Sequence, residues 1–147
     1  MGMLDGKVAI VTGAGHGIGR GHALELAKHG ATVIVNDLGG SVTGEGTGRD
    51  ADLTVKIIEE RGGTAASNYA DVSDYDQAGE MIAQAVNDFG RLDILVNNAG
   101  IVRDGSIFNM SVDDFDAVLK VHLRGTWIPC KHAALHWRAL NKETGQK

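Results

Sequence analysis

The sequence predicts an α/β fold in which helices cover a doubly wound parallel sheet. Short runs of apolar and β-branched residues alternate four times with longer segments of good helix formers. The first of these runs leads into a turn with glycine at every second position. Short strand–helix spacing requires right-handed crossovers and parallel strands, so we expect the first strand at the centre, in the strand order 3-2-1-4.

The first strand and the turn that follows it organise the chain. Residues 8–12 form a short apolar run that suits a strand buried on both faces, and a helix is expected from Ile18 to about His29, where Gly30 ends it. Strand, glycine turn and helix N-terminus together bind a pyrophosphate, because glycine admits phosphates close to the backbone and the free N–H groups face their charge. The glycines of this turn are Gly13, Gly15, Gly17 and Gly19.

The glycine turn is not a complete signature by itself. Its spacing differs from the G-x-G-x-x-G fingerprint, and the glycines alone fit a plain tight turn equally well. No Lys-Ser or Lys-Thr pair follows Gly19, which excludes a P-loop of the Walker type. The segments that follow the turn therefore carry the argument for a dinucleotide.

The second strand is expected at residues 32–36 and ends in Asp37, 18 residues after Gly19. A carboxylate at this position can accept hydrogen bonds from the ribose hydroxyls of an adenosine, although Asp37 could also be a plain turn residue. Its charge would repel a 2′-phosphate, and the neighbouring His16 and Leu38 offer no fixed cation. We therefore expect the cofactor to be NAD rather than NADP.

The middle of the chain continues the alternation. The polar, glycine-rich segment 39–48 is either a functional flap or flexible, and we expect it to be flexible. A helix over 51–60 and a weaker strand over 64–70 follow. Ser73 is expected to cap a third helix that Gly90 ends. The apolar positions of this helix recur with helical spacing at Ala78, Met81, Ile82, Ala85, Val86 and Phe89.

The last part of the chain holds one more strand and a long helix. The apolar run 92–96 is followed at once by Asn97-Asn98-Ala99-Gly100, at the edge of the sheet where ligands bind. Ser111 is expected to cap the helix, which we expect to break near Pro129 and to resume through Trp137. Its buried face is predicted to carry Phe115, Val118, Leu119 and His122.

Composition excludes several other classes of protein. The 147 residues suffice for one domain, and a net charge of −5 gives no basic face for nucleic acid. No apolar run is long enough for a membrane span, and no signal-peptide core is present. The single Cys130 excludes an internal disulfide and fits a reducing compartment. A cytoplasmic protein is therefore expected.

Three motifs in order resemble the short-chain dehydrogenase/reductase family over nearly the whole chain. They are T-G-A-G-H-G-I-G at 12–19, Asp71-Val72, and N-N-A-G at 97–100. Within the family, residues 35–40 and 121–125 look most like the (3R)-hydroxyacyl-CoA dehydrogenase part of peroxisomal multifunctional β-oxidation enzymes and their bacterial relatives. The resemblance implies a Rossmann-like fold, a homo-oligomer and a small-molecule substrate such as an acyl-CoA. The cofactor-binding residues would be Gly13, Gly15, His16, Gly17, Ile18, Gly19, Asp37, Asp71, Val72, Asn98, Ala99, Gly100 and Val121.

The sequence departs from the family pattern in two places. His122 stands where many members have a catalytic Asn, and its role is either a proton relay or a hydrogen-bonded structural histidine. In the family, the catalytic Ser and the Tyr-x-x-x-Lys motif lie beyond the fourth helix. Residues 1–147 contain neither of them. Residues 1–147 are therefore expected to be the N-terminal, NAD(P)-binding part of an alcohol–ketone oxidoreductase and to be inactive alone. The alternative is a dinucleotide-binding module without catalysis.

The remaining candidates have plainer interpretations. His132 and His136 have a spacing that can hold a metal, but no third ligand is evident, so we expect no metal site. Cys130 is expected to be a small core residue. Trp127 and Trp137 could pack internally or lie at a subunit interface, and we expect the interface.

Overall fold

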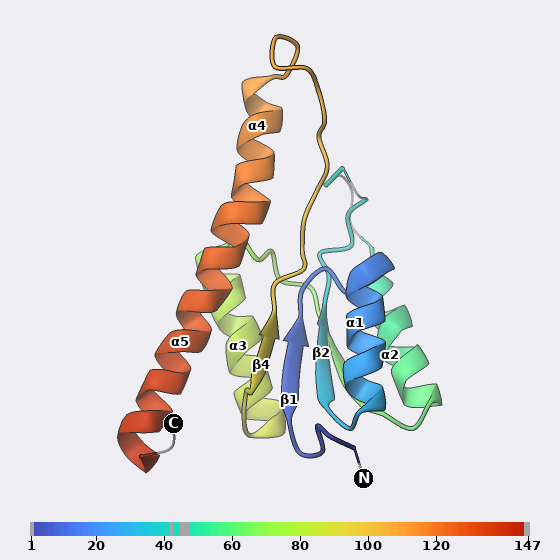
Figure 1. Ribbon diagram of the computed structural model, residues 1–147, viewed down its shortest axis with the longest axis vertical. Coiled ribbons are helices and arrows are strands. Elements are labelled where there is room, and N and C mark those ends of the chain that lie inside the picture. The colour runs from blue at the N-terminus through green and yellow to red at the C-terminus, as the bar shows by residue number, and fades with distance from the viewer. Residues whose placement is uncertain (1, 42, 45–47, 146–147) are drawn as a thin grey trace.

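The protein is a parallel sheet with helices on both faces (Figure 1). The computed structural model describes residues 2–41, 43–44 and 48–145. The sheet has the order β3-β2-β1-β4, so the predicted fold class and strand order are confirmed. Its strands are β1 (Val8–Val11), β2 (Thr32–Asn36), β3 (Thr64–Asn68) and β4 (Ile94–Val96).

The central strand β1 aligns the carboxyl ends of its neighbours. Val11 lies opposite Val35 of β2 and Val96 of β4. The fourth strand begins at Ile94, two residues later than expected, because the Asp93 carboxylate accepts from the Val8 N–H at 2.9 Å in place of a main-chain carbonyl. The loops that follow β1, β2 and β4 therefore emerge together at one edge.

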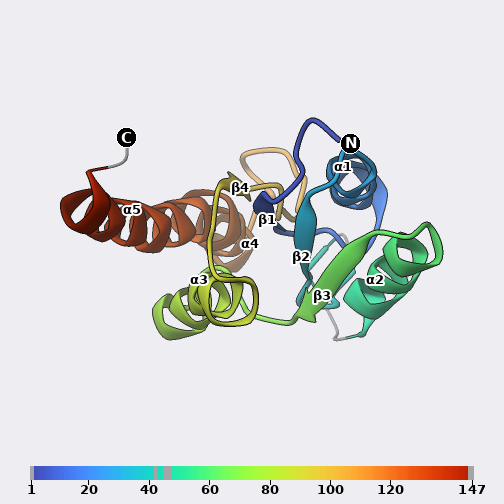
Figure 2. The same cartoon turned by 90° about the horizontal axis from the view of Figure 1, so that it is seen from below.

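The helices form a layer on each side of the sheet (Figure 2). One core joins Ile10 and Ile34 to Met81 and Ala133, and the other joins Val11 and Val35 to the first two helices. Successive strand residues enter opposite cores, as the period of a strand requires. The helices are α1 (Gly17–Lys28), α2 (Asp50–Glu60), α3 (Tyr75–Phe89), α4 (Val112–Leu119) and α5 (Gly125–Thr144), with a π-helical turn η1 (Lys120–Arg124).

The cap of α3 differs from the prediction. Asp74, not Ser73, accepts the capping hydrogen bond, from the Gln77 N–H at 2.9 Å. The Ser73 hydroxyl instead donates to the Asp71 carboxylate at 2.6 Å. The Ser73 hydroxyl thus bonds the carboxylate and not the first N–H groups of α3. Gly90 ends the helix with φ +81°, as predicted.

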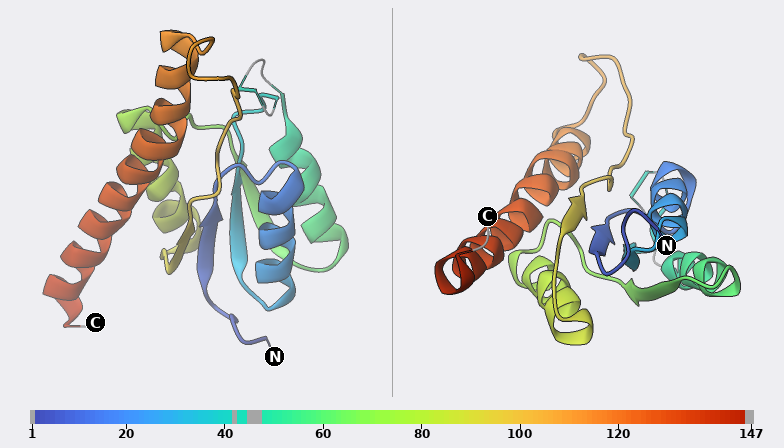
Figure 3. Two further views of the ribbon diagram at one scale, coloured as in Figure 1. Left: turned by 45° about the horizontal axis from the view of Figure 1, so that its top comes forward. Right: turned by 60° about the horizontal axis from the view of Figure 1, so that its bottom comes forward.

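The long final helix does not break at Pro129. Proline lacks an N–H, and its ring crowds the carbonyl four residues earlier, here Gly125. The irregularity lies just upstream, where the Gly125 N–H bonds the Lys120 carbonyl across the wider π turn. Pro129 lies buried near the start of α5, and α4, η1 and α5 form one continuous rod (Figure 3). In the described part of the chain, no helix is long and apolar enough to cross a bilayer.

Candidate functional site

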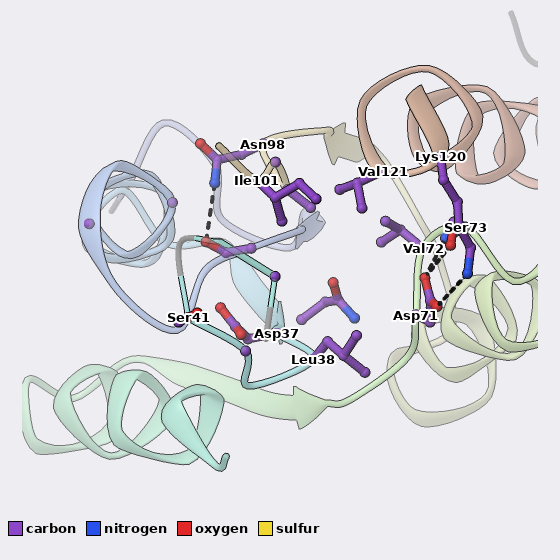
Figure 4. A pocket seen from close by; sticks show the side chains of 18 of the residues that line it. Asp37, Leu38, Ser41, Asp71, Val72, Ser73, Asn98, Ile101, Lys120 and Val121 are labelled. Atoms are coloured by element: carbon purple, nitrogen blue, oxygen red, sulfur yellow. Dashed lines mark hydrogen bonds and ion pairs between the residues drawn. The ribbon is translucent and has the colours of Figure 1, made fainter. Parts of the chain in front are cut away.

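A pocket of about 510 Å³ opens at the carboxyl edge of the sheet. The loops after β1, β2, β3 and β4 form its walls, together with η1 (Figure 4). Its volume lies within the range of ligand sites, and its place at the strand ends is where sheets of this kind bind ligands. Of the cofactor-binding residues predicted from the sequence, all line this pocket except Gly15, which is buried behind it.

The glycine turn has no space for side chains at two of its glycines. Gly13 has φ +62°, and a Cβ there would lie 2.8 Å from the Cα of Ala99. A Cβ on Gly19 would collide with the Gly13 carbonyl and with the Asn98 amide. The turn therefore packs backbone against backbone, which requires glycine at both positions.

Helix α1 presents its N-terminus to the pocket. Its N-cap residue His16 has extended backbone angles, and its side chain makes no capping hydrogen bond to any described residue. Ile18, in the first turn, is 75% exposed. Because the first N–H groups of a helix have no intrahelical acceptor, this end of the pocket suits an anionic group such as a pyrophosphate.

Asp37 lies at the end of β2 and is only 6% exposed. Its two carboxylate oxygens accept from the N–H groups of Gly15, at 2.8 Å, and of Gly39, at 2.7 Å. Each oxygen keeps a further lone pair, so the fixed carboxylate can still accept from a hydroxyl in the pocket. Asp37 is thus a fixed hydrogen-bond acceptor, which is what the two hydroxyl donors of a ribose require.

The cations of the pocket wall are engaged with carboxylates. Arg103 pairs with Asp114 at 3.0 Å, and the Lys120 ammonium lies 3.9 Å from Asp71. Asp71 also accepts from the N–H of Ser73 at 2.8 Å. The segment that carries Asp71 and Val72 is therefore held in place at the far side of the pocket from Asp37 (Figure 4).

The loops after β1 and β4 are bonded to each other through Thr12 and Asn98. The Thr12 hydroxyl accepts from the N–H groups of Asn98 and Ala99, both at 3.0 Å. The Asn98 amide donates to the carbonyls of Thr12, at 3.0 Å, and Gly13, at 3.1 Å. Thr12 was not among the predicted site residues, although a hydroxyl at the end of an otherwise apolar strand was a signal for it.

His122 lies in the π turn and is exposed, not on a buried face as predicted. Phe115 and Leu119 of α4 are exposed as well, and no residue of α4 is buried, so the predicted buried face is wrong along the whole of this helix. The His122 Nε2 atom lies 2.8 Å from the Ile101 carbonyl and 3.1 Å from the Ile101 N–H. Its ring also packs against Gly100, where a Cβ would lie 2.7 Å from Cε1. The contacts fit the interpretation of a hydrogen-bonded structural histidine.

The described parts of segment 39–48 contact the rest of the protein. The backbones of Gly39 and Gly48 pack closely together, and the Thr43 carbonyl accepts from Arg103 Nε at 3.0 Å. Gly44 packs against Ile101. The expectation of flexibility also covers positions 42 and 45–47, which lie outside the described residues.

Cys130 is exposed rather than part of the core, and its sulfur accepts from the Asn97 amide at 3.2 Å. Helix α5 buries its neighbours Ile128 and Pro129 instead, and the Cys130 thiol faces the loop after β4. His132 bonds the Tyr75 carbonyl at 2.8 Å. In residues 2–41, 43–44 and 48–145, no group of three metal-ligating side chains comes together.

The polar network behind the glycine turn was not predicted. The Arg20 guanidinium and the Thr54 hydroxyl both bond the Gly15 carbonyl. Thr54 lies 39 residues after Gly15 and on another helix, so no local pattern connects the two. In the sequence, Thr54 is one polar residue within the predicted helix 51–60, which gave no signal for this contact.

Comparisons with known proteins agree with this geometry. The family model described as "short chain dehydrogenase" matches residues 7–146. The peroxisomal multifunctional enzyme A of Dictyostelium discoideum is 51% identical over 137 residues, which cover 92% of this chain and 30% of that protein. A hydroxyacyl-CoA dehydrogenase of Mycobacterium tuberculosis is 44% identical over 140 residues, or 95% of this chain and 43% of that enzyme.

The structural comparison gives the same picture. The crystal structure of a short chain dehydrogenase from Mycobacterium avium superposes with a TM-score of 0.90 at 50% identity. The match covers 97% of this chain and 50% of the crystallised chain. This chain thus spans half or less of the length of these relatives.

Proposed function

This chain belongs to the short-chain dehydrogenase family, and from that premise we propose that it is the NAD-binding, N-terminal part of an oxidoreductase. The family uses nicotinamide dinucleotides, and the relatives are oxidoreductases. The proposed reaction interconverts an alcohol and a ketone.

The observation that carries the proposal is the Asp37 carboxylate in the pocket wall. It is buried, fixed by two backbone N–H groups and close to the N-terminus of α1. A dinucleotide needs both features, since its pyrophosphate is anionic and its adenosine ribose carries hydroxyl donors. A 2′-phosphate beside Asp37 would meet a buried negative charge, which favours NAD over NADP.

The proposed substrate class is a 3-hydroxyacyl-CoA, oxidised to the 3-ketoacyl-CoA. The Mycobacterium tuberculosis relative is named as a hydroxyacyl-CoA dehydrogenase, which supports this choice. Residues 121–125 also resemble the (3R)-hydroxyacyl-CoA dehydrogenase part of the peroxisomal multifunctional enzymes. Transfer of the hydride is the chemistry that the cofactor supplies when bound. The residues of this chain would bind and orient it.

The general base that alcohol oxidation requires is proposed to lie elsewhere in the full-length protein. No tyrosine is among the described residues that line the pocket. Tyr69 is followed four residues later by Ser73, and Tyr75 by Gly79, so neither forms Tyr-x-x-x-Lys. We therefore propose that residues 1–147 alone do not turn over substrate.

The experiment that tests the cofactor is a titration of the full-length protein with NAD and with NADP. We expect the protein to bind NAD more tightly than NADP. We expect Asp37→Ala to reduce the difference between the two affinities without abolishing NAD binding, because Asp37 distinguishes the ribose 2′-hydroxyl from the 2′-phosphate. A loss of about 1–3 kcal/mol in NAD affinity is the scale of an unpaired buried hydrogen bond.

The matched control is Asp5→Ala, which removes an aspartate that is not among the described residues of the pocket wall. Equal or tighter binding of NADP by the unmodified protein would contradict the assignment. Binding of NAD without any dehydrogenase activity in the full-length protein would favour the binding module instead.

We also propose that the protein forms a homo-oligomer through the outer side of α4, η1 and α5. Phe115, Leu119, Leu123 and Trp127 recur there at four-residue intervals and are exposed.

A cytoplasmic location remains a prediction, and some relatives are named as peroxisomal enzymes. Imaging of the tagged full-length protein tests it.

A further inference from the structure

The glycine turn is held from behind by two side chains that do not line the pocket. Thr54, in α2, is fully buried, and its hydroxyl lies 3.0 Å from the Ala14 carbonyl and 3.2 Å from the Gly15 carbonyl. Arg20, in α1, donates through Nε to the Thr54 hydroxyl at 3.0 Å and through Nη2 to the Gly15 carbonyl. The two helices thus meet at one pair of carbonyl groups.

These bonds fix which way each peptide group of the turn faces. In the Ala14–Gly15 peptide, the carbonyl accepts from the Thr54 hydroxyl and the N–H donates to the Asp37 carboxylate at 2.8 Å. In the Gly15–His16 peptide, the carbonyl accepts from Arg20 and from Thr54. A trans peptide is planar, with C=O and N–H on opposite sides, so the His16 N–H must face away from Thr54.

The side away from Thr54 is the pocket. His16 and Gly17 line it, while Arg20 and Thr54 are absent from its described lining. The carbonyl groups, which would repel an anion, are therefore turned toward α2, and the N–H groups at the start of α1 are left for the ligand. Glycine at 13, 15, 17 and 19 gives this segment freedom to turn the other way, so the orientation needs a restraint.

Resting on the proposed dinucleotide function, we propose that Thr54 and Arg20 are positioning residues for the cofactor. They hold the Ala14 and Gly15 carbonyls against α2, so that the turn offers only N–H groups to the pyrophosphate. Neither residue touches the ligand. Loss of the restraint lets carbonyl oxygens face the phosphates and weakens binding of ligands that contain a pyrophosphate.

The test compares ligands with and without phosphates on the full-length protein. Thr54→Val keeps the shape of the side chain and removes the hydroxyl, while Thr54→Ser keeps the hydroxyl. Binding of NAD, ADP-ribose and adenosine is measured by calorimetry for each variant. We expect Thr54→Val to weaken NAD and ADP-ribose about ten-fold, the effect of one unmet buried hydrogen bond, with adenosine affinity unchanged and with Thr54→Ser close to the unmodified protein.

A second variant covers the case in which Thr54→Val does not fold. Arg20→Gln changes a half-buried side chain and removes the bonds to Gly15 and Thr54, and the same selective loss is expected. Equal loss for adenosine and NAD, or no loss for either variant, overturns the positioning role. Failure of the unmodified protein to bind NAD or NADP overturns the proposed function itself, and this outcome is read before any variant is compared.

Discussion

Single glycines of the turn determine whether the pocket can form. A Cβ on Gly19 would collide with the Gly13 carbonyl and the Asn98 amide, which bonds the loops after β1 and β4 together. We expect Gly19→Val to lower NAD affinity at least ten-fold and to destabilise the fold by about 1–3 kcal/mol without unfolding it, as overpacking does. Titration with NAD and thermal unfolding of the full-length protein measure the two effects.

Gly21 provides the matched control. It lies in the same helix, and a Cβ there meets nothing within 4 Å. Gly21→Ala should leave NAD binding unchanged and should not destabilise the helix, since alanine is the better helix former. If Gly19→Val bound NAD as tightly as the unmodified protein, the assignment of the phosphate turn would be wrong.

Prediction of individual residues from the sequence succeeded where the local chain determines the environment. The spacing of Ala78, Met81, Ile82 and Ala85 predicted one helical face, and all four are buried. It failed for the face of Phe115, Leu119 and His122, because α4 and η1 bury none of their residues. It also missed Thr54, whose bonds to the glycine turn join residues far apart in the chain.

At the scale of elements, Asp52 joins the first turn of α2 to β3. Its carboxylate accepts from the hydroxyls of Tyr69 and Ser67 and pairs with Arg49 at 2.8 Å. These donors, with the Tyr69 hydroxyl foremost, lower the pKa of Asp52 from 3.8 to about 2. The carboxylate form is thus the one that the folded state favours.

The sign of the pH dependence follows from this lowered pKa. The folded pKa lies below the unfolded value, so the stabilisation is complete above about pH 4 and is lost as the pH falls toward about 2. Tyr69→Phe keeps the ring and removes the largest donor. We expect it to raise the pKa of Asp52 and to move acid unfolding to higher pH. NMR titration measures the pKa of Asp52.

Tyr75→Phe is the matched control, because Tyr75 lies at the start of α3 and contacts His132. It should leave the acid transition where it is. An Asp52 pKa that does not change in Tyr69→Phe would show that the hydroxyl does not hold the carboxylate.

The boundaries of elements were predicted least well where side chains replace main-chain partners. Strand β2 has the predicted bounds, since its apolar run is uninterrupted. The fourth strand and the cap of α3 moved because Asp93, Asp71 and Asp74 take hydrogen bonds that a propensity argument assigns to the backbone or to Ser73. The irregularity of the last helix lies at η1 and not at its proline, because the Gly125 N–H bonds the Lys120 carbonyl there.

At the scale of the whole molecule, α4, η1 and α5 carry exposed apolar side chains at four-residue intervals along one side. Leu123 is 67% and Trp127 57% exposed, and the Lys131 ammonium lies 5.1 Å from the Trp127 ring. Acidic residues cluster at the α4 end, as Asp113 and Asp116, and basic residues follow toward α5. Two copies that pair antiparallel would therefore bring opposite charges together around a shared apolar stripe.

This arrangement predicts a dimer that a charge within the stripe disrupts. Leu123→Asp places a carboxylate in the apolar contact, where its desolvation is not compensated, and we expect it to weaken self-association of the full-length protein at least ten-fold. Leu53→Asp is the matched control, since Leu53 is 50% exposed on α2, away from the stripe. Sedimentation velocity over a range of concentrations measures both. A Leu123→Asp protein that associates as strongly as the Leu53→Asp protein would exclude this side of the molecule as the interface, because burial of position 123 is what the antiparallel pairing requires.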